Sequence, residues 1–349
     1  RFSKISSAFS LFLMLGMLIF EGFAFVDQLA KSVTTHKIIL PLVFFGILML
    51  ASGILNLPFT LYSTFVIEEQ FGFNRTTLKT FVLDLFKGIL VTSVLGGVLM
   101  SLFIWFYNTT GNLFWLWAWG VFSLFMILIT MFYASVIVPL FNKLKPLPAT
   151  ELRTEIEQYC KKVGFKLDNL FVMDGSKRSS KANAFFSGLG AKKRIVLYDT
   201  LINEYTKEEI TAVLAHEIGH YKKKHTLTTM LVSILQIGVM LFVLSLVINK
   251  PEFSLALGVE EPNFYVGLLV FSMLYSPLSM LIGVGMNVIS RKNEYEADSY
   301  AKLTYDEKPL ISSLKKLSVD SLSNLTPHPY YVFVNYSHPT LLQRIAKLK

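Results

Sequence analysis

The stretch Val213-Leu-Ala-His-Glu-Ile-Gly-His220 decides the fold, because it carries the pattern H-E-x-x-H and leads closely into the apolar segment Thr226–Ile248. Residues four apart on a helix share one face, so the imidazoles of His216 and His220 can reach a single ion. Glu217 lies one residue away and contacts the water of that ion instead. The pattern predicts one zinc ion, Zn2+, that lowers the pKa of its bound water toward about 7. Glu217 is then the base that takes a proton as the water attacks a peptide carbonyl.

The helix that carries this motif is expected to begin at a capping box, Thr206-Lys-Glu-Glu209. It closes a polar insert, residues 142–225, that we predict to be a small domain of helices and strands. The other expected elements of this insert are a helix at Glu151–Val163, short strands at Asn169–Met173 and Arg194–Tyr198, and a hairpin turn at Gly188 and Gly190.

Outside the insert the chain is dominated by apolar blocks long enough to cross a bilayer, which takes about 20 residues. The chain has 349 residues, of which 53% are hydrophobic and 16% charged, against about 25% charged in soluble domains. Glu21 and the lack of a small-residue cleavage site argue that the first block is not a signal peptide. Six spans are predicted, at Ala8–Val26, Ile38–Tyr62, Phe81–Tyr107, Leu113–Phe141, Thr226–Ile248 and Phe264–Ile289.

These spans predict a mainly α-helical, polytopic membrane protein with a small α+β zinc-protease domain on the cytosolic side. We divide it into residues 1–141 with about four spans, the insert 142–225 ending in the H-E-x-x-H helix, residues 226–289 with two spans, and the C-terminal segment 290–349. Basic residues concentrate in the insert and the C-terminal segment, whereas the loop Lys250–Asn263 is acidic, so the positive-inside rule places the first two in the cytosol.

Composition also excludes other classes of protein. One cysteine, Cys160, rules out an internal disulfide framework. The formal charge of +9 could suit a nucleic-acid binder, but no aromatic-basic recognition motif accompanies it.

The third metal ligand must come from elsewhere in the chain, and Glu294 just beyond the last span is the best candidate. An oxygen ligand beside two nitrogens leaves the fourth position open for water. Asp298, four residues on, lies on the same helical face and could fix the tautomer of a ligating histidine. The alternative is that both belong to a solvated acidic face; Glu296 faces away from Glu294 and is left out of the site.

His338, in Ser337-His-Pro-Thr340, is a candidate donor to the oxyanion of a tetrahedral intermediate. Arg344 could assist it or bind a substrate carboxylate. An ordinary loop explains an isolated His-Pro equally well. His225, after the lysine cluster Lys222–Lys224, is interpreted as interfacial and not as a ligand.

The chain resembles the type I CAAX prenyl proteases, which are integral-membrane zinc endopeptidases, over nearly its whole length. The motifs that carry the resemblance are Leu57-Pro-Phe, Thr64–Glu69 with Gly72-Phe-Asn74, Pro139–Lys143, Asn183-Ala184, Lys193–Leu197 with Asp199-Thr200, the zinc motif, Ser290-Arg291, Glu294-Tyr295, Ala297-Asp298 and Ser337-His-Pro339.

The resemblance implies a role for each matching position. It makes His216, His220 and Glu294 the zinc ligands, Glu217 the catalytic base, Asp298 an outer partner of the metal ligands, His338 and Arg344 catalytic groups on the substrate side, and Asn183 and Ala184 an edge strand that pairs with an extended substrate.

The resemblance also implies a ring of transmembrane helices around a large chamber. Eukaryotic members have seven spans and six are predicted here, so the family's first span looks absent or removed. The expected location is the endoplasmic reticulum membrane or a bacterial inner membrane, and the expected partners are a prenylated peptide or protein and membrane lipids.

Three functions remain open from the sequence. The first is a CAAX-type endopeptidase, which the full motif set favours. The second is a membrane-protein quality-control zinc protease with broad substrates. The third is a non-catalytic transporter or scaffold with structural zinc, against which Glu217 beside a ligand and the lack of cysteine ligands both argue.

Overall fold

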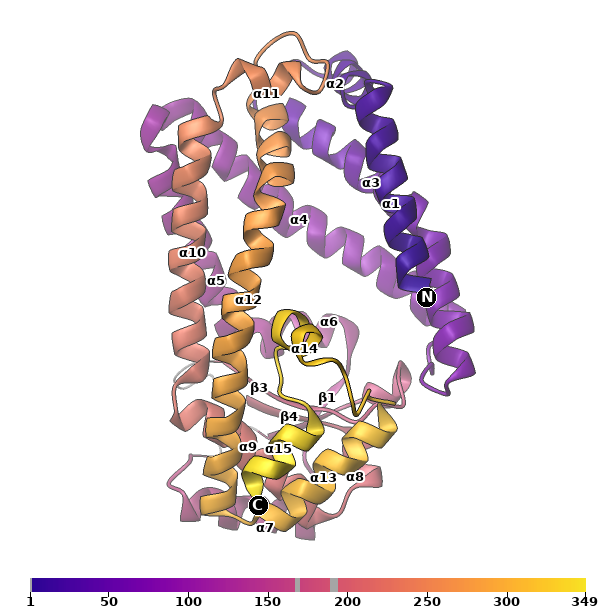
Figure 1. Ribbon diagram of the computed structural model, residues 1–349, viewed down its shortest axis with the longest axis vertical. Helices are drawn as coiled ribbons and strands as arrows, with labels where there is room; N and C mark the ends of the chain where they lie inside the picture. Colours follow the sequence, from indigo (N-terminus) through magenta and orange to yellow (C-terminus); the bar gives the residue numbers. More distant parts are fainter. Residues whose placement is uncertain (1, 167–169, 189–193) are drawn as a thin grey trace. The chain divides into compact units, whose positions relative to one another are not determined.

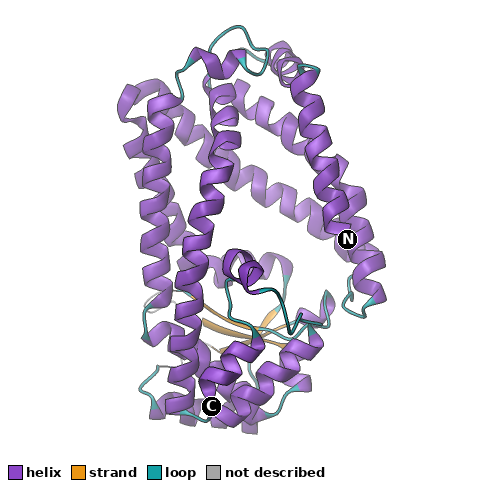
Figure 2. Ribbon diagram, in the orientation of Figure 1, coloured by secondary structure: helices purple, strands orange, loops and turns teal. Residues whose placement is uncertain are grey.

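The computed structural model describes residues 2–166, 170–188 and 194–349, and helices make up most of them (Figure 2). The chain divides into two compact units. The first comprises Arg1–Gln70, Gly88–Leu124 and Ile234–Leu278; the second comprises Phe71–Lys87, Phe125–Ser233 and Ser279–Lys349.

The first unit is helical (Figure 1), and its long helices are mostly apolar. Large side chains such as Phe12, Leu90 and Leu274 are 71%, 65% and 63% exposed, which fits surfaces that face lipid and not water. The helices wholly or partly within it are α1 (Phe2–Ile19), α2 (Gly22–Val33), α3 (Ile39–Tyr62) with the π-helical turn Ser63–Glu68, α4 (Leu78–Thr110), α5 (Phe114–Phe132), α10 (His225–Val247), α11 (Pro251–Leu255) and α12 (Phe264–Thr304).

Five helical stretches among the described residues are long and apolar enough to cross a membrane, where six spans were predicted. The difference arises because one stretch, Leu78–Phe141, contains two predicted spans. Within it the 3-10 turn Gly111–Leu113 separates α4 from α5, and Gly111 takes a φ of 54° that suits glycine.

The first predicted span, Ala8–Val26, is wrong in its boundaries. α1 covers Phe2–Ile19, and Glu21 adopts a left-handed conformation with φ 53° that interrupts the helix before α2. A left-handed residue cannot continue a right-handed helix, so the apolar block is divided between two helices.

The second unit contains a four-stranded sheet with the strand order β1-β2-β4-β3. β2 and β4 are parallel, and both outer strands are antiparallel to their neighbours. The strands are β1 (Leu144–Pro146), β2 (Leu170–Met173), β3 (Ala184–Ser187) and β4 (Arg194–Tyr198). Parts of α4, α5, α10 and α12 also belong to this unit. The helices wholly within it are α6 (Val138–Phe141), which follows the π-helical turn Tyr133–Ile137, α7 (Glu151–Lys162), α8 (Asp199–Glu204), α9 (Lys207–Lys222), α13 (Glu307–Asp320), α14 (Pro329–Asn335) and α15 (Leu341–Leu348).

The expected helix and both expected strands of the insert are present, the strand at Arg194–Tyr198 with identical bounds. β3 and β4 form the expected antiparallel pair, although Asn169 and Gly190 lie outside the described residues. β3 begins at Ala184, where the resemblance implied an edge strand, whereas β1 was not predicted.

α9 is the central helix of this unit. It contacts α7, α13 and β3, and its side chains Ile210, Leu214 and Ile218 are almost completely buried in the apolar core. This burial fixes the rotation of α9, because its core face cannot turn toward solvent without exposing these side chains.

Candidate active site

The capping box predicted for α9 is present. The Thr206 hydroxyl accepts from the Glu209 amide at 3.3 Å, and the Glu209 carboxylate accepts from the Thr206 amide at 3.0 Å. The cap fixes where the helix begins. His216 and His220 follow on consecutive turns of the same helix, with their Nε2 atoms 3.1 Å apart.

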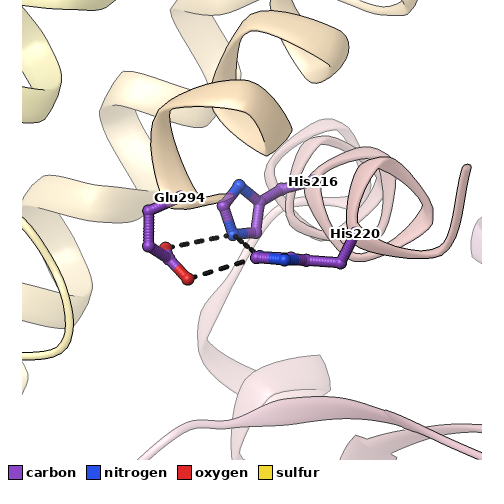
Figure 3. A group of neighbouring side chains, drawn as sticks. All are labelled: His216, His220 and Glu294. Carbon is purple, nitrogen blue, oxygen red and sulfur yellow. Dashed lines mark hydrogen bonds and ion pairs between the residues drawn. The ribbon is translucent and has the colours of Figure 1, made fainter. Parts of the chain in front are cut away.

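Glu294 comes from α12 and meets both imidazoles, as Figure 3 shows. Its Oε2 lies 3.4 Å from His216 Nε2, and its Oε1 lies 3.3 Å from His220 Nε2. Its helix continues directly from the last predicted span, since α12 runs without interruption from Phe264 to Thr304.

A glycine permits α9 and α12 to approach each other here. A Cβ atom on Gly219 would stand 3.1 Å from both the Cα atom and the carbonyl oxygen of Ala297. Those neighbours are backbone atoms, which cannot rotate away as a flexible side chain does. The residue preceding His220 therefore sets how close the helix of Glu294 can come.

The three side chains fit a metal ion. Each offers one ligand atom, and these atoms lie within 4.8 Å of one another. Tetrahedral zinc with bonds of about 2.0–2.1 Å separates its ligands by about 3.3 Å. The two Nε2 atoms are 3.1 Å apart, and each has one oxygen of Glu294 at a similar distance, Oε2 at 3.4 Å from His216 and Oε1 at 3.3 Å from His220. Moreover, Glu294 Oε2 is buried and accepts no hydrogen bond within the described chain, although Arg344 Nη1 lies 3.5 Å from it, so this oxygen can still bind a metal cation.

A carboxylate contacts the ring nitrogen of His216 that points away from Glu294, Nδ1. Nδ1 lies 2.9 Å from Oδ1 of Asp298, whose side chain is 1% exposed. Arg344 donates to both oxygens of Asp298, through Nη2 at 2.6 Å and Nε at 2.8 Å. Arg344 Nη2 is also 3.4 Å from His216 Nδ1, but when Nδ1 carries the proton that Asp298 accepts, both groups are donors and no bond joins them.

Two pKa values describe the electrostatics of α9. Burial opposes protonation of His216, yet its contacts with Asp298 and Glu294 outweigh burial and raise its pKa to about 9. A metal ion must therefore displace a proton from His216 below that pH. Burial raises the pKa of Glu217 above its ordinary value, which strengthens it as a base.

His220 has a different outer partner, which sequence reasoning missed. Its Nδ1 lies 3.0 Å from Nδ1 of His225, and His225 Nε2 lies 3.2 Å from Oε2 of Glu296. His225 is only 6% exposed, so it is buried in the protein beside His220, a contact that the interpretation as interfacial did not include. Glu296, which was left out of the site, reaches it through His225.

His338 stands at the edge of the site. Its Nε2 is 3.4 Å from Glu294 Oε1, its side chain is 64% exposed, and Ser337 Oγ lies 2.9 Å from its Nδ1. A Ser337 hydroxyl that donates to Nδ1 leaves the proton on Nε2, on the side of the metal ligands.

A cavity of about 220 Å³ brings the predicted residues together. It is lined by the ligand triad and Glu217, by His338 and Arg344, and by Asn183 and Ala184 at the start of β3. β3 pairs with β4 alone among the described strands, and its first residue, Ala184, lines the same cavity as His216, His220 and Glu294. A second cavity of about 440 Å³ also reaches Glu217 and His220, from the side of His225 and Phe186.

Comparison with known proteins assigns nearly the whole chain to one family of proteases. The family model described as the CAAX prenyl protease N-terminal region with five membrane helices matches residues 1–143, and the model of peptidase family M48 matches residues 146–349. A CAAX prenyl protease 1 homolog of Oryza sativa is 38% identical over 90% of this chain and 74% of its own length.

Further relatives agree. CAAX prenyl protease 1 of Saccharomyces cerevisiae is 37% identical over 88% of this chain and 71% of its own length, and the human homolog is 33% identical over 90% and 74%. The crystal structure of S. mikatae Ste24p matches all of this chain and 86% of that protein, with a TM-score of 0.95 and 34% identity. The chain is thus a multi-pass membrane metalloprotease and belongs to peptidase family M48, within its type I CAAX prenyl protease group.

Proposed function

We propose that this chain is a zinc endopeptidase that hydrolyses a peptide bond near the C-terminus of prenylated CAAX proteins or related lipidated peptides. The single observation that carries the chemistry is the convergence of two imidazoles and a carboxylate beside Glu217 in one cavity. The relatives' printed name, CAAX prenyl protease 1, supports the substrate class.

The ligand set favours zinc among divalent ions. Two imidazoles and one carboxylate, with a vacant coordination position, are the ligands of many catalytic zinc sites. Zinc held by His216, His220 and Glu294 would polarise a water and the substrate carbonyl.

The remaining groups of the cavity then have distinct tasks. Glu217 takes a proton from the attacking water and passes it to the leaving amine. His338 Nε2–H is placed to donate to the oxyanion that develops on the carbonyl. Arg344 is held by Asp298, so we propose that it acts on catalysis chiefly through the position of that carboxylate.

The substrate backbone has a matching surface in β3. An extended peptide could add to the available edge of the sheet by β-augmentation, beginning at Asn183 and Ala184, so that its carbonyl lies near the ligand triad. The positive-inside rule supports an active site on the cytosolic side of the endoplasmic reticulum membrane or a bacterial inner membrane.

The test compares a farnesylated CAAX peptide with the same peptide lacking the lipid, using purified protein with zinc. We expect preferential cleavage of the farnesylated peptide, and a loss of at least ~10²-fold in turnover for Glu217→Gln with zinc retained. Equal cleavage of both peptides would instead favour a quality-control protease with broad substrates. Full activity of Glu217→Gln would refute the assignment of the base.

A further inference from the structure

The two metal-binding histidines differ in what holds their outer nitrogens. His216 Nδ1 meets the carboxylate of Asp298 directly at 2.9 Å. His220 Nδ1 meets another imidazole, that of His225, at 3.0 Å. A ligating histidine usually donates its second N–H to a carboxylate, a carbonyl or water, which fixes its tautomer and its orientation.

We propose that His225 and Glu296 form a two-residue arm that fixes the tautomer and orientation of His220, which makes both of them positioning residues for the metal. This inference rests on the proposed zinc site. It gives each histidine of the H-E-x-x-H motif its own carboxylate, one in direct contact and one reached through an imidazole.

The positions of the protons allow one arrangement only. His220 Nε2 faces Glu294 Oε1 and must be unprotonated to bind a metal, so its proton resides on Nδ1. Nδ1–H then donates to His225 Nδ1, and the proton of His225 resides on Nε2, which donates to Oε2 of Glu296. The opposite direction would protonate His220 Nε2 and block the metal. Glu296 at the end of the arm favours the arrangement that permits metal binding, because an ionised carboxylate can only accept a hydrogen bond and so requires the proton of His225 on Nε2.

The backbone between α9 and α10 is shaped to bring His225 to this place. α9 ends at Lys222, and Lys224 takes a left-handed conformation with φ 60°. Such a conformation is uncommon for a residue with a side chain and is energetically unfavourable. The turn starts α10 at His225 and returns its ring to His220, with ring centroids 5.1 Å apart.

His225 is not a fourth ligand. Its Nδ1 approaches the outer nitrogen of His220, and its Nε2 approaches Glu296, so both ring nitrogens are engaged away from Glu294. Burial of the ring at 6% exposure protects the link to His220 from competition by water. Glu296 is 39% exposed, so its effect should be the smaller of the two.

The test measures zinc affinity of the purified full chain by competition with a chelator. We expect His225→Leu to weaken zinc binding 10–100-fold, the usual effect of losing an outer partner. His225→Asn should recover most of the affinity, because its amide oxygen can stand where Nδ1 accepts. Glu296→Gln should lose only severalfold. Lys292→Ala is the matched control for a charge change beside Glu296. The Nζ atom of Lys292 lies 3.9 Å from Glu296 Oε1, and its side chain is 77% exposed.

A second readout separates positioning from general structural support. With Co2+ in place of zinc, the visible spectrum should change in His225→Leu and return toward that of the unmutated protein in His225→Asn. Binding by His225→Leu within twofold of the unmutated protein would overturn the proposal, as would equal losses in both His225 variants together with a lower melting temperature of the metal-free protein. Failure of the unmutated protein to bind zinc would instead refute the proposed function.

Discussion

Substitution of Asp298 by asparagine tests how the site holds His216. Asp298 accepts three hydrogen bonds in nearly complete burial: one from His216 at 2.9 Å and two from Arg344 at 2.6 and 2.8 Å. Asparagine keeps the shape but offers one oxygen and one NH2 group. If its oxygen serves His216, its NH2 group faces the Nε–H of Arg344, and two donors meet.

Two separate losses are expected from this change. The metal affinity should fall 10–100-fold because His216 loses its anionic partner. The metal-free protein should lose about 3 kcal/mol of stability, since removal of one partner of a buried ion pair costs about 3–5 kcal/mol. The low end applies because Arg344 Nη1 still has Glu294 Oε2 at 3.5 Å.

The assay combines chelator competition for zinc with thermal unfolding of the metal-free protein in detergent. The control is the double variant Asp298→Asn with Arg344→Gln, which removes the unpaired guanidinium. It should regain much of the melting temperature but little of the zinc affinity. Recovery of both would show that the unpaired charge, and not the orientation of His216, caused the loss. Zinc affinity within twofold in Asp298→Asn would refute the outer role of this carboxylate.

Four further predictions follow from the same geometry. Glu294→Ala should lose zinc in a stoichiometry measurement, and full occupancy would remove it from the ligand set. The raised pKa of Glu217 means that activity is lost as pH falls through that value, so the acid limb of kcat/KM should lie above the ordinary glutamate pKa of 4.5. Gly219→Ala should weaken zinc binding, measured by chelator competition, because its Cβ would press on the backbone of Ala297. Thr206→Ala removes the N-cap of α9 and should lower the stability of the protein by about 1 kcal/mol. The melting temperature should fall while the zinc stoichiometry stays unchanged.

Much of the fold could be predicted because it depends on local patterns. Long apolar blocks indicate membrane spans, and the capping box at Thr206 indicates where α9 begins; both are features of adjacent residues. The break after α1 was not predicted, and a residue distant in the sequence lies beside it. Glu21 is left-handed, and its side chain packs against Gly258, where a Cβ would stand 3.3 Å from it.

The candidate site shows the same division between local and distant information. The spacing of His216 and His220 predicts a shared helical face, and α9 presents both to one point. The sequence left open whether Glu294 and Asp298 belong to the metal site or to a solvated acidic face. The structure brings both to the imidazoles, because the glycine at 219 lets α12 approach α9.

Glu296 shows why helical spacing alone misjudges a metal site. On α12 it points away from Glu294, and this argument excluded it from the site. That argument assumes that the ligands lie on one side of the helix only. The turn at Lys224 brings His225 to the other side, so Glu296 faces a residue that in turn contacts His220. A histidine soon after H-E-x-x-H, at the start of an apolar span, is the signal that could have revealed the pair, because an imidazole removed from water requires a polar partner.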